Sequence, residues 1–176
     1  MAAVSAAAYG GIVNTSEFDD MEALGAAFDA ATTDEEIIAM TTQAMGADSP
    51  YVSQSMGMAI EIPLGRPQGA KGRIVAVFTT APNPGRFQAS VAFAGQVSEV
   101  MERHGGRNCR LWQAQANGVL PDVCYFVTEW DTMKAYGKSV GSMYTDPALQ
   151  SLMEMMQGSD SPFRNISADM YTEIGG

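Results

Sequence analysis

The chain has 176 residues, and its 20 acidic and 10 basic side chains give it a net charge of −10. This balance argues against binding to nucleic acid or to an anionic membrane surface, because both attract clustered Lys and Arg. No apolar run approaches the roughly 20 residues of a membrane span. The opening MAAVSAAAYGG also lacks the basic region of a signal peptide.

Cysteine and histidine are scarce, with only Cys109, Cys124 and His104 in the whole chain. Three such residues are too few for a Cys/His metal site, so no metal and no cofactor are expected. We interpret both cysteines as reduced packing residues of a cytoplasmic protein, with a disulfide as the alternative. A simple hairpin would place Cys109 opposite the region of Trp130, which favours the reduced pair.

The first 62 residues predict strands, a broken helix and a closing strand. Residues 1–18 alternate weakly around a Tyr-Gly-Gly turn, as strands do. Asp19 is placed to cap a helix that ends near Thr33, and Asp34 is placed to cap a second helical piece. Residues 53–62 then indicate a strand.

Residues 63–72, PLGRPQGAKG, predict a linker, because Pro and Gly dominate and little can be buried. A complete unit follows in 73–176. Its predicted elements are a strand at 73–80, a helix at 87–105, strands at 108–116 and 123–130, a helix at 132–144 and a strand at 165–174. Asp131 is placed to cap the second of these helices, which restarts at Asp146-Pro147 with Asp146 as its N-cap. This β-α-β-β-α-β order is typical of a ferredoxin-like unit, so the fold class is α+β. Helices would cover one sheet face, and the other face would need a partner.

An internal repeat organises the chain, since residues 17–62 match 129–174 at a constant offset of 112. Without any gap, 15 of the 46 positions are identical, most of them caps, turn residues and helical glycines. Glycine is costly inside a helix, so we expect Gly25 and Gly137 to permit close packing of the helix against a neighbour. A bulky residue at Gly137 should then destabilise the fold.

The domain organisation is therefore a half repeat over 1–62, a linker, and a complete repeat over 73–176. The missing first half of the first copy has two interpretations. Either further residues precede Met1, which we favour slightly, or the native protein has one and a half repeats and a second chain covers the open sheet. Both interpretations predict an unpaired sheet edge near residues 1–12.

Three features carry a resemblance to a known superfamily: a strand ending in Glu129-Trp130-Asp131 (Glu17-Phe18-Asp19 in the first copy), a helix broken at Thr145-Asp146-Pro147, and the closing strand. With them the chain resembles the dimeric α+β barrel superfamily, which includes antibiotic-biosynthesis-type monooxygenases and stress-responsive proteins. The resemblance covers 73–174 fully and 10–62 by half. It implies sheets packed face to face, and hence a homodimer or self-association through the sheet face.

Strand alternation predicts which polar side chains face a cavity between such sheets. Tyr125 and Glu129 share one face of their strand, and Tyr171 and Glu173 share one face of the last strand. The apolar residues of these strands must face the helices, which leaves these four as candidate ligand-binding residues. Trp112 is a fifth candidate, whose face the sequence does not fix.

The candidate catalytic residues are Glu129, Tyr125 and His104, with a desolvated carboxylate as a general base. The structural alternative is that the tyrosines fill the sheet interface and that Glu129 is solvated or paired with Arg. His104 follows a predicted helix, where a cation interacts well with the free carbonyls.

Two functions remain in view. One is a small-molecule enzyme, such as a cofactor-independent monooxygenase or an isomerase. The other is a non-catalytic binding or assembly module of the same fold. Haem degradation is not expected, because the superfamily members that perform it use an Asn on the first strand and a His on the second helix, and this chain has neither. We favour a small-molecule-binding protein with no nucleic-acid or membrane partner.

Overall fold

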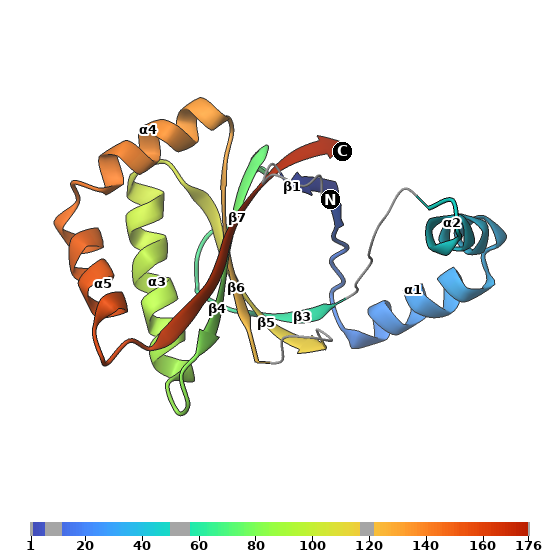
Figure 1. The fold of residues 1–176 in the computed structure, drawn as a ribbon, viewed down its shortest axis with the longest axis horizontal. Helices are drawn as coiled ribbons and strands as arrows, with labels where there is room; N and C mark the ends of the chain where they lie inside the picture. Colours follow the sequence, from blue (N-terminus) through green and yellow to red (C-terminus); the bar gives the residue numbers. More distant parts are fainter. Residues whose placement is uncertain (1, 6–11, 50–56, 117–121, 176) are drawn as a thin grey trace. The chain divides into compact units, whose positions relative to one another are not determined.

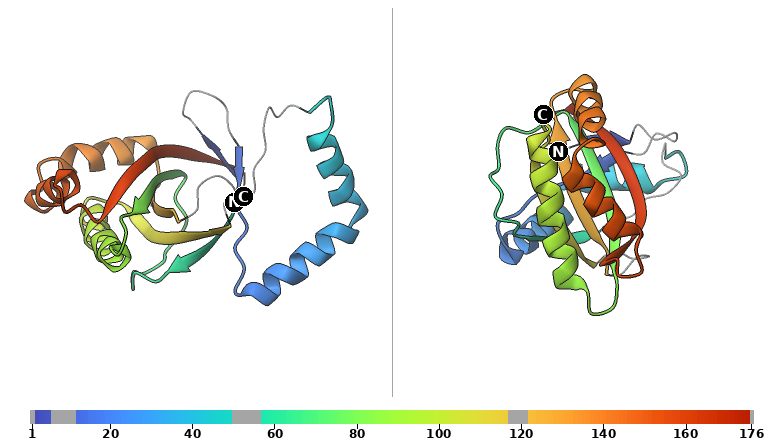
Figure 2. Two further views of the ribbon diagram at one scale, coloured as in Figure 1. Left: turned by 60° about the horizontal axis from the view of Figure 1, so that its bottom comes forward. Right: turned by 90° about the vertical axis from the view of Figure 1, so that its left-hand side faces the viewer.

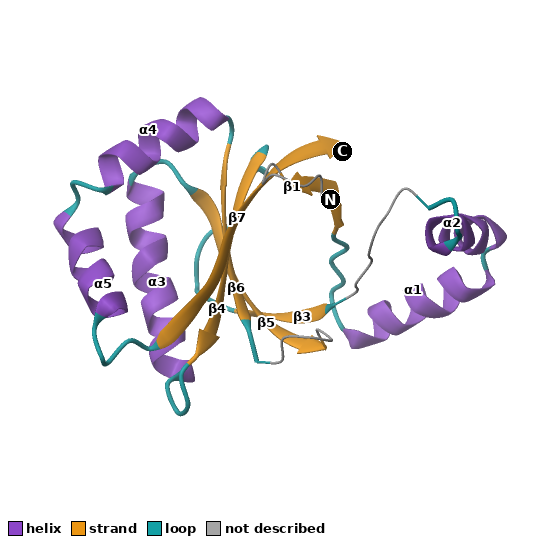
Figure 3. Cartoon of the chain, in the orientation of Figure 1, coloured by secondary structure: helices purple, strands orange, loops and turns teal. Residues whose placement is uncertain are grey.

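The computed structural model describes residues 2–5, 12–49, 57–116 and 122–175. Within them the chain is an α+β protein with five helices and one antiparallel sheet (Figures 1 and 3). In chain order the elements are β1 (Ala2–Ser5), β2 (Ile12–Asn14), α1 (Met21–Thr33), α2 (Glu35–Met45), β3 (Met58–Ile62), β4 (Ile74–Pro82), α3 (Phe87–Arg103), β5 (Arg107–Ala116), β6 (Cys124–Trp130), α4 (Met133–Met143), α5 (Pro147–Gln157) and β7 (Phe163–Gly175). The predicted Tyr-Gly-Gly turn, the 117–121 loop and the start of the predicted 53–62 strand lie outside the described residues.

The contacts divide the chain into two compact units, which are Met1–Asn14 with Gly57–Gly176, and Thr15–Met56. The first unit contains all seven strands, in the order β2-β1-β7-β4-β6-β5-β3. The element order β4-α3-β5-β6-α4-α5-β7 confirms the order predicted from the sequence. The second unit contains α1 and α2.

The sheet joins the two copies of the repeat through two reciprocal strand pairings. β3 pairs antiparallel with β5, and β7, which contains the repeat equivalent of β3, pairs antiparallel with β1. At the offset of 112, β1 corresponds to residues 114–117 at the end of β5 and beyond. The same two strand types therefore meet twice. Because β1 pairs on both sides, the open edges of the sheet, among the strands that the structure describes, are those of β2 and β3.

The repeat is also visible in local structure. α2 and α5 begin and end at residues that differ by 112. Asp34 and Asp146 cap these two helices as predicted, with φ of −81° and −78°. For the preceding helices the predicted caps are wrong by one residue. The N-caps are Asp20 and Thr132, whose side-chain oxygens accept from the N–H of the third residue of each helix, Ala23 and Ala135.

The main core lies between the sheet and the three helices α3, α4 and α5, which cover one of its faces (Figures 1 and 2). Alternate residues of β4, β5 and β6 point to this face. The largest buried side chain is Trp130 at the end of β6, which is 1% exposed. Phe93 of α3 and Phe163 of β7 meet edge to face, with ring centroids 4.9 Å apart.

The predicted linker is irregular but firmly attached. Leu64 packs against the main core, and the Arg66 guanidinium binds Glu99 and the Gly95 carbonyl of α3. At its far end, the Gly72 N–H donates to Glu129 Oε2 at 2.6 Å. Most residues of this segment are exposed, as expected, while these contacts tie it to α3 and β6.

The expectation of close packing at the helical glycines is wrong. A Cβ atom added to Gly25 or Gly137 would meet no atom within 4 Å beyond its own helix and chain neighbours. Gly72 is the glycine at which a side chain would not fit. A Cβ atom there would lie 2.7 Å from the Trp130 carbonyl oxygen. The close approach is thus at the end of the linker and not in the helices.

Candidate functional site

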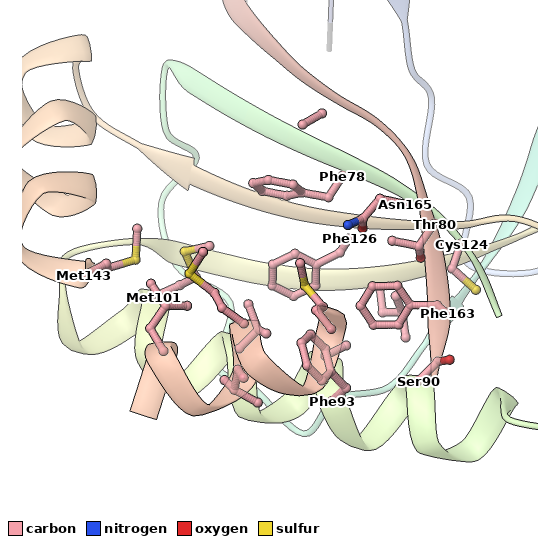
Figure 4. A pocket seen from close by; sticks show the side chains of 18 of the residues that line it. Phe78, Thr80, Ser90, Phe93, Met101, Cys124, Phe126, Met143, Phe163 and Asn165 are labelled. Atoms are coloured by element: carbon pink, nitrogen blue, oxygen red, sulfur yellow. The ribbon is translucent and has the colours of Figure 1, made fainter. Parts of the chain in front are cut away.

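A pocket of about 510 Å³ lies between the helices and the sheet of the first unit (Figure 4). Phe78 and Phe126 project from the strands, and Phe93 and Met101 project from α3, toward the same space. Strand alternation brings the first two to the helix-covered face, and the helical period turns the other two toward the sheet. A volume of this size is within the range of small-molecule sites.

The walls of the pocket are mostly apolar and aromatic. The Trp130 and Tyr136 rings meet edge to face at 5.0 Å between centroids, and both line the pocket. α5 adds aliphatic and thioether surface through Leu152 and Met156. Such walls favour an apolar ligand with a flat ring system, because aromatic side chains offer large, stiff contact surfaces.

One residue of the wall, Trp130, carries a buried hydrogen-bond donor without an acceptor. Among the described residues, three buried side-chain polar atoms have no partner, and of these only Trp130 Nε1 belongs to a residue that lines the pocket. Ser90, also in the wall, is already satisfied, since its Oγ donates to the Pro162 carbonyl at 2.9 Å. A buried donor without an acceptor costs free energy, and a ligand oxygen would remove that cost.

The two cysteines are free, as predicted, and buried. Cys124 lines the pocket, and burial raises the pKa of its thiol. Burial also raises the pKa of the Cys109 thiol, whose Sγ lies 3.4 Å from Thr128 Oγ1. Because the thiolate is the nucleophilic form, Cys124 offers the pocket a weakly polar surface and not an activated nucleophile.

The predicted ligand-binding residues on β5, β6 and β7 lie on the opposite sheet face from this pocket. Trp112 is the direct neighbour of Tyr125 in the β5–β6 pairing, so it shares that face. Tyr171 and Glu129 both pair with Val75, which places them on the same face as each other. The structure thus brings these side chains together, while the predicted cavity between two sheets stays a prediction.

Two further observations describe that face. Burial raises the pKa of Tyr171, and the nearby Asp169 carboxylate and Tyr125 add to the rise. Glu173 is half-buried, two residues farther along β7. Trp112 lies under the Arg110 guanidinium at 4.3 Å, and Arg110 also holds both carboxylate oxygens of Glu61 on β3. This second contact anchors the pairing of β3 with β5.

The carboxylate of Glu129 has a structural role. It is 5% exposed, and its Oε2 accepts from the Gly72 N–H at 2.6 Å and from Asn108 Nδ2 at 2.9 Å. Asn108 has a φ of +49° and also bonds the linker through Gly69 and Ala70. Glu129 therefore joins β5, β6 and the linker, and it does not line the pocket.

His104 bridges two helices at the surface of the first unit. Its Nδ1 lies 2.8 Å from Ser142 Oγ, and its Nε2 lies 2.9 Å from Asp146 Oδ2. The trio contains the residue types of a hydrolase triad, but Ser142 Oγ donates to the Ser139 carbonyl at 2.9 Å. The Ser139 carbonyl therefore competes with the imidazole for the single hydroxyl hydrogen of Ser142. The arrangement ties the end of α3 to the α4–α5 junction.

The carboxyl group of Asp146 predicts how the stability of this junction changes with pH. Its hydrogen bonds with His104, Arg103 and the Ala148 N–H hold its pKa well below the usual range. A lowered folded-state pKa contributes stability above the unfolded pKa, near 4, and the contribution is lost as the pH falls below that value. Asp146→Asn keeps a good N-cap and removes the charge. We expect the variant to have a lower melting temperature than the wild type at pH 7. The difference between the two melting temperatures should be smaller at pH 2.5.

Melting temperatures from circular dichroism at the two pH values measure this gap. An equal gap at both would show that the charge of Asp146 does not stabilise the junction.

Two further findings concern metal binding and membrane spans. Among the described residues, no three or more His, Cys, Asp and Glu side chains gather closely enough to hold a metal ion. Across the same part of the chain, no helix has the length and apolar character needed to cross a membrane.

The sequence patterns did not reveal the pocket. They placed the apolar side of β6 against the helices, which the structure confirms for Phe126. The useful signal was the number of large aromatic and Met side chains on that one side, since such side chains fill space irregularly. Comparison with protein-family models and with curated proteins found no match for this chain.

Proposed function

We propose that the protein binds an apolar small molecule, built on a ring system and carrying one hydrogen-bond acceptor, in the pocket between α3, α4, α5 and the sheet. The observations that carry the proposal are an apolar space of about 510 Å³ and, in its wall residue Trp130, a buried indole N–H without an acceptor. Apolar burial would supply the affinity, and the indole N–H would fix the orientation. This use differs from the predicted cavity on the other sheet face.

We further propose that the complete repeat is a ferredoxin-like unit of the dimeric α+β barrel type. The sheet order β7-β4-β6-β5, with both helical segments on one face, supports this proposal. A catalytic use, as in a cofactor-independent monooxygenase or isomerase, would need a general base at the pocket. Glu129 and His104 lie outside its wall, so binding is the better supported function.

A non-catalytic assembly module is the second candidate function, and the open edges of β2 and β3 favour it. Unpaired strand edges attract further strands. The superfamily resemblance would make the partner a second copy, joined through the sheet face.

Two naphthalene probes test the pocket. We expect naphthalene and 2-acetylnaphthalene to bind one per chain, with the ketone oxygen accepting from Trp130 Nε1. Trp130→Phe keeps an aromatic wall and removes the donor, so it should weaken the ketone about 5- to 10-fold and leave naphthalene nearly unchanged, since one hydrogen bond contributes about 1 kcal/mol. Titration calorimetry measures both affinities.

A steric variant supplies the matched control. Val97 lines the pocket from α3, so Val97→Trp should weaken both probes by at least tenfold. Val127 is also half-buried. It lies two residues from both Tyr125 and Glu129 along β6, so it shares with them the sheet face opposite the pocket. Val127→Trp should therefore preserve binding in folded protein. Equal losses in the two variants, or no binding by wild type, would refute the pocket.

A further inference from the structure

We propose that the ligand of the pocket is an elongated, neutral molecule with a polar group at each of its two ends. One end is the acceptor that meets the Trp130 indole N–H. The other end is a hydroxyl or amide head group that meets Thr80 and Asn165. This ligand occupies the pocket of the proposed function, on which the inference rests. Its length, its second polar group and its lack of charge go beyond that function.

Three side chains form a polar row across one end of the pocket. Thr80 of β4 pairs with Cys124 of β6 on one side and with Asn165 of β7 on the other. All three line the pocket, and Figure 4 shows them close together beside Phe163. Thr80 is half-buried and Asn165 is exposed, so this end of the pocket opens to water. A ligand would therefore place its head group here.

Two members of the polar row are available to a ligand. No other described residue forms a hydrogen bond with the Thr80 hydroxyl or with the Asn165 side-chain amide. Ser90 lies at the same end of the pocket, but its Oγ already donates to the Pro162 carbonyl. A hydroxyl and an amide can each donate and accept a hydrogen bond. Together they suit a ligand hydroxyl or amide, which has the same two abilities.

The polar row and Trp130 stand at opposite ends of a long space. Cys124 and Trp130 both line it and are six residues apart on β6, which is about 20 Å at the usual rise of a strand. Ser90 and Met101 line it from α3, and the eleven residues between these positions span about 16 Å of helix. In Figure 4, Ser90 lies at the right of the pocket and Met101 at the left. A space of about 510 Å³ with this length is narrow, so it fits an extended molecule better than a compact one.

A neutral head group fits the polar row better than a charged one. Among the described residues that line the pocket there is no Lys, Arg, His, Asp or Glu. A charged head group would lose hydration on entering and gain no ion pair in return. The net charge of −10 on the whole chain disfavours an anion further. The structure therefore favours a long alcohol or amide over a fatty-acid carboxylate or a phosphate ester.

Three probes with one scaffold test the second polar end. They are 2-acetyl-6-hexylnaphthalene and two analogues, whose hexyl chain ends in a hydroxyl or in a carboxylate. The ketone faces the Trp130 donor in each probe, so only the chain end differs. Thr80→Val and Asn165→Leu keep the size of the side chain and remove its hydrogen-bonding group. By titration calorimetry, we expect each variant to weaken the hydroxyl probe about 5-fold and to leave the hexyl probe nearly unchanged, as the loss of one hydrogen bond predicts.

Thr79→Val is the matched control. Thr79 precedes Thr80 in β4 but pairs with Tyr125, so its side chain lies on the sheet face opposite the pocket. This variant should bind all three probes as the wild type does. Equal affinity of the wild type, Thr80→Val and Asn165→Leu for the hydroxyl probe would overturn the inference. Tighter binding of the carboxylate than of the hydroxyl by the wild type would overturn it as well.

Unsubstituted naphthalene separates this inference from the proposed function. A wild type that binds naphthalene, with variants that treat the hexyl and hydroxyl probes alike, would remove only the second polar end. A wild type that binds neither naphthalene nor any of the three probes would refute the pocket itself.

Discussion

Gly72→Ala is expected to lower the free energy of unfolding by about 3 kcal/mol, because overpacking at a rigid site costs this much. The new methyl carbon would lie 2.7 Å from the Trp130 carbonyl oxygen and 2.8 Å from both the Trp130 nitrogen and Glu129 Cβ. Two of these atoms are backbone of β6, which pairs on both sides and cannot move away easily. Urea unfolding measures the loss, and the melting temperature should fall by roughly 6–12 °C.

Gly137→Ala is the matched control for this prediction. The same methyl group there meets no atom within 4 Å beyond its own helix and chain neighbours, and the position lies inside α4. Alanine is the better helix former, so this variant should gain about 0.5–1 kcal/mol. If the two variants change stability in the same direction, the contrast between the linker glycine and the helical glycine is wrong.

The second large effect is expected at Glu129. Glu129→Leu removes the acceptor of two buried donors, the Gly72 N–H and Asn108 Nδ2. Each unsatisfied buried donor costs about 1–3 kcal/mol, so the variant should lose about 3 kcal/mol or more of unfolding free energy. Glu129→Gln keeps an oxygen that can accept from both donors, and it should lose about 1 kcal/mol.

The same pair of variants separates a structural role of Glu129 from a catalytic one. Glu129 does not line the pocket, so Glu129→Gln should bind naphthalene as wild type does. Chemical denaturation and probe titration, carried out on one preparation, provide both quantities. Full stability in Glu129→Leu would mean that the linker does not depend on this carboxylate.

Local signals made much of the fold predictable from the sequence. Asp34 and Asp146 precede their helices at equivalent places, and both act as caps. The earlier caps were misplaced by one residue for a simple reason. Asp19 stands beside Asp20, and Asp131 beside Thr132, so two good capping residues compete at each site and tertiary context selects the second.

The site was less predictable, because a cavity depends on how far the helices stand from the sheet. Alternation assigns Phe126 and Trp130 to the helix side, but no pattern says whether their neighbours fill the space between them. The contacts of His104 show the same limit. Its partner Asp146 is 42 residues away along the chain, and only the packed helices bring them together.

The pairing of β1 with β7 has a consequence for synthesis on the ribosome. Ala2 pairs with Gly175, so this contact joins residues that lie 173 positions apart in the sequence (175 − 2), and β1 must wait for β7 to be made. β7 also pairs with β4, so the centre of the sheet is completed only after β7 has left the ribosome. Such distant pairings slow folding, and they leave the early strands exposed to other chains in the meantime. We expect the nascent protein to depend on chaperones until β7 emerges.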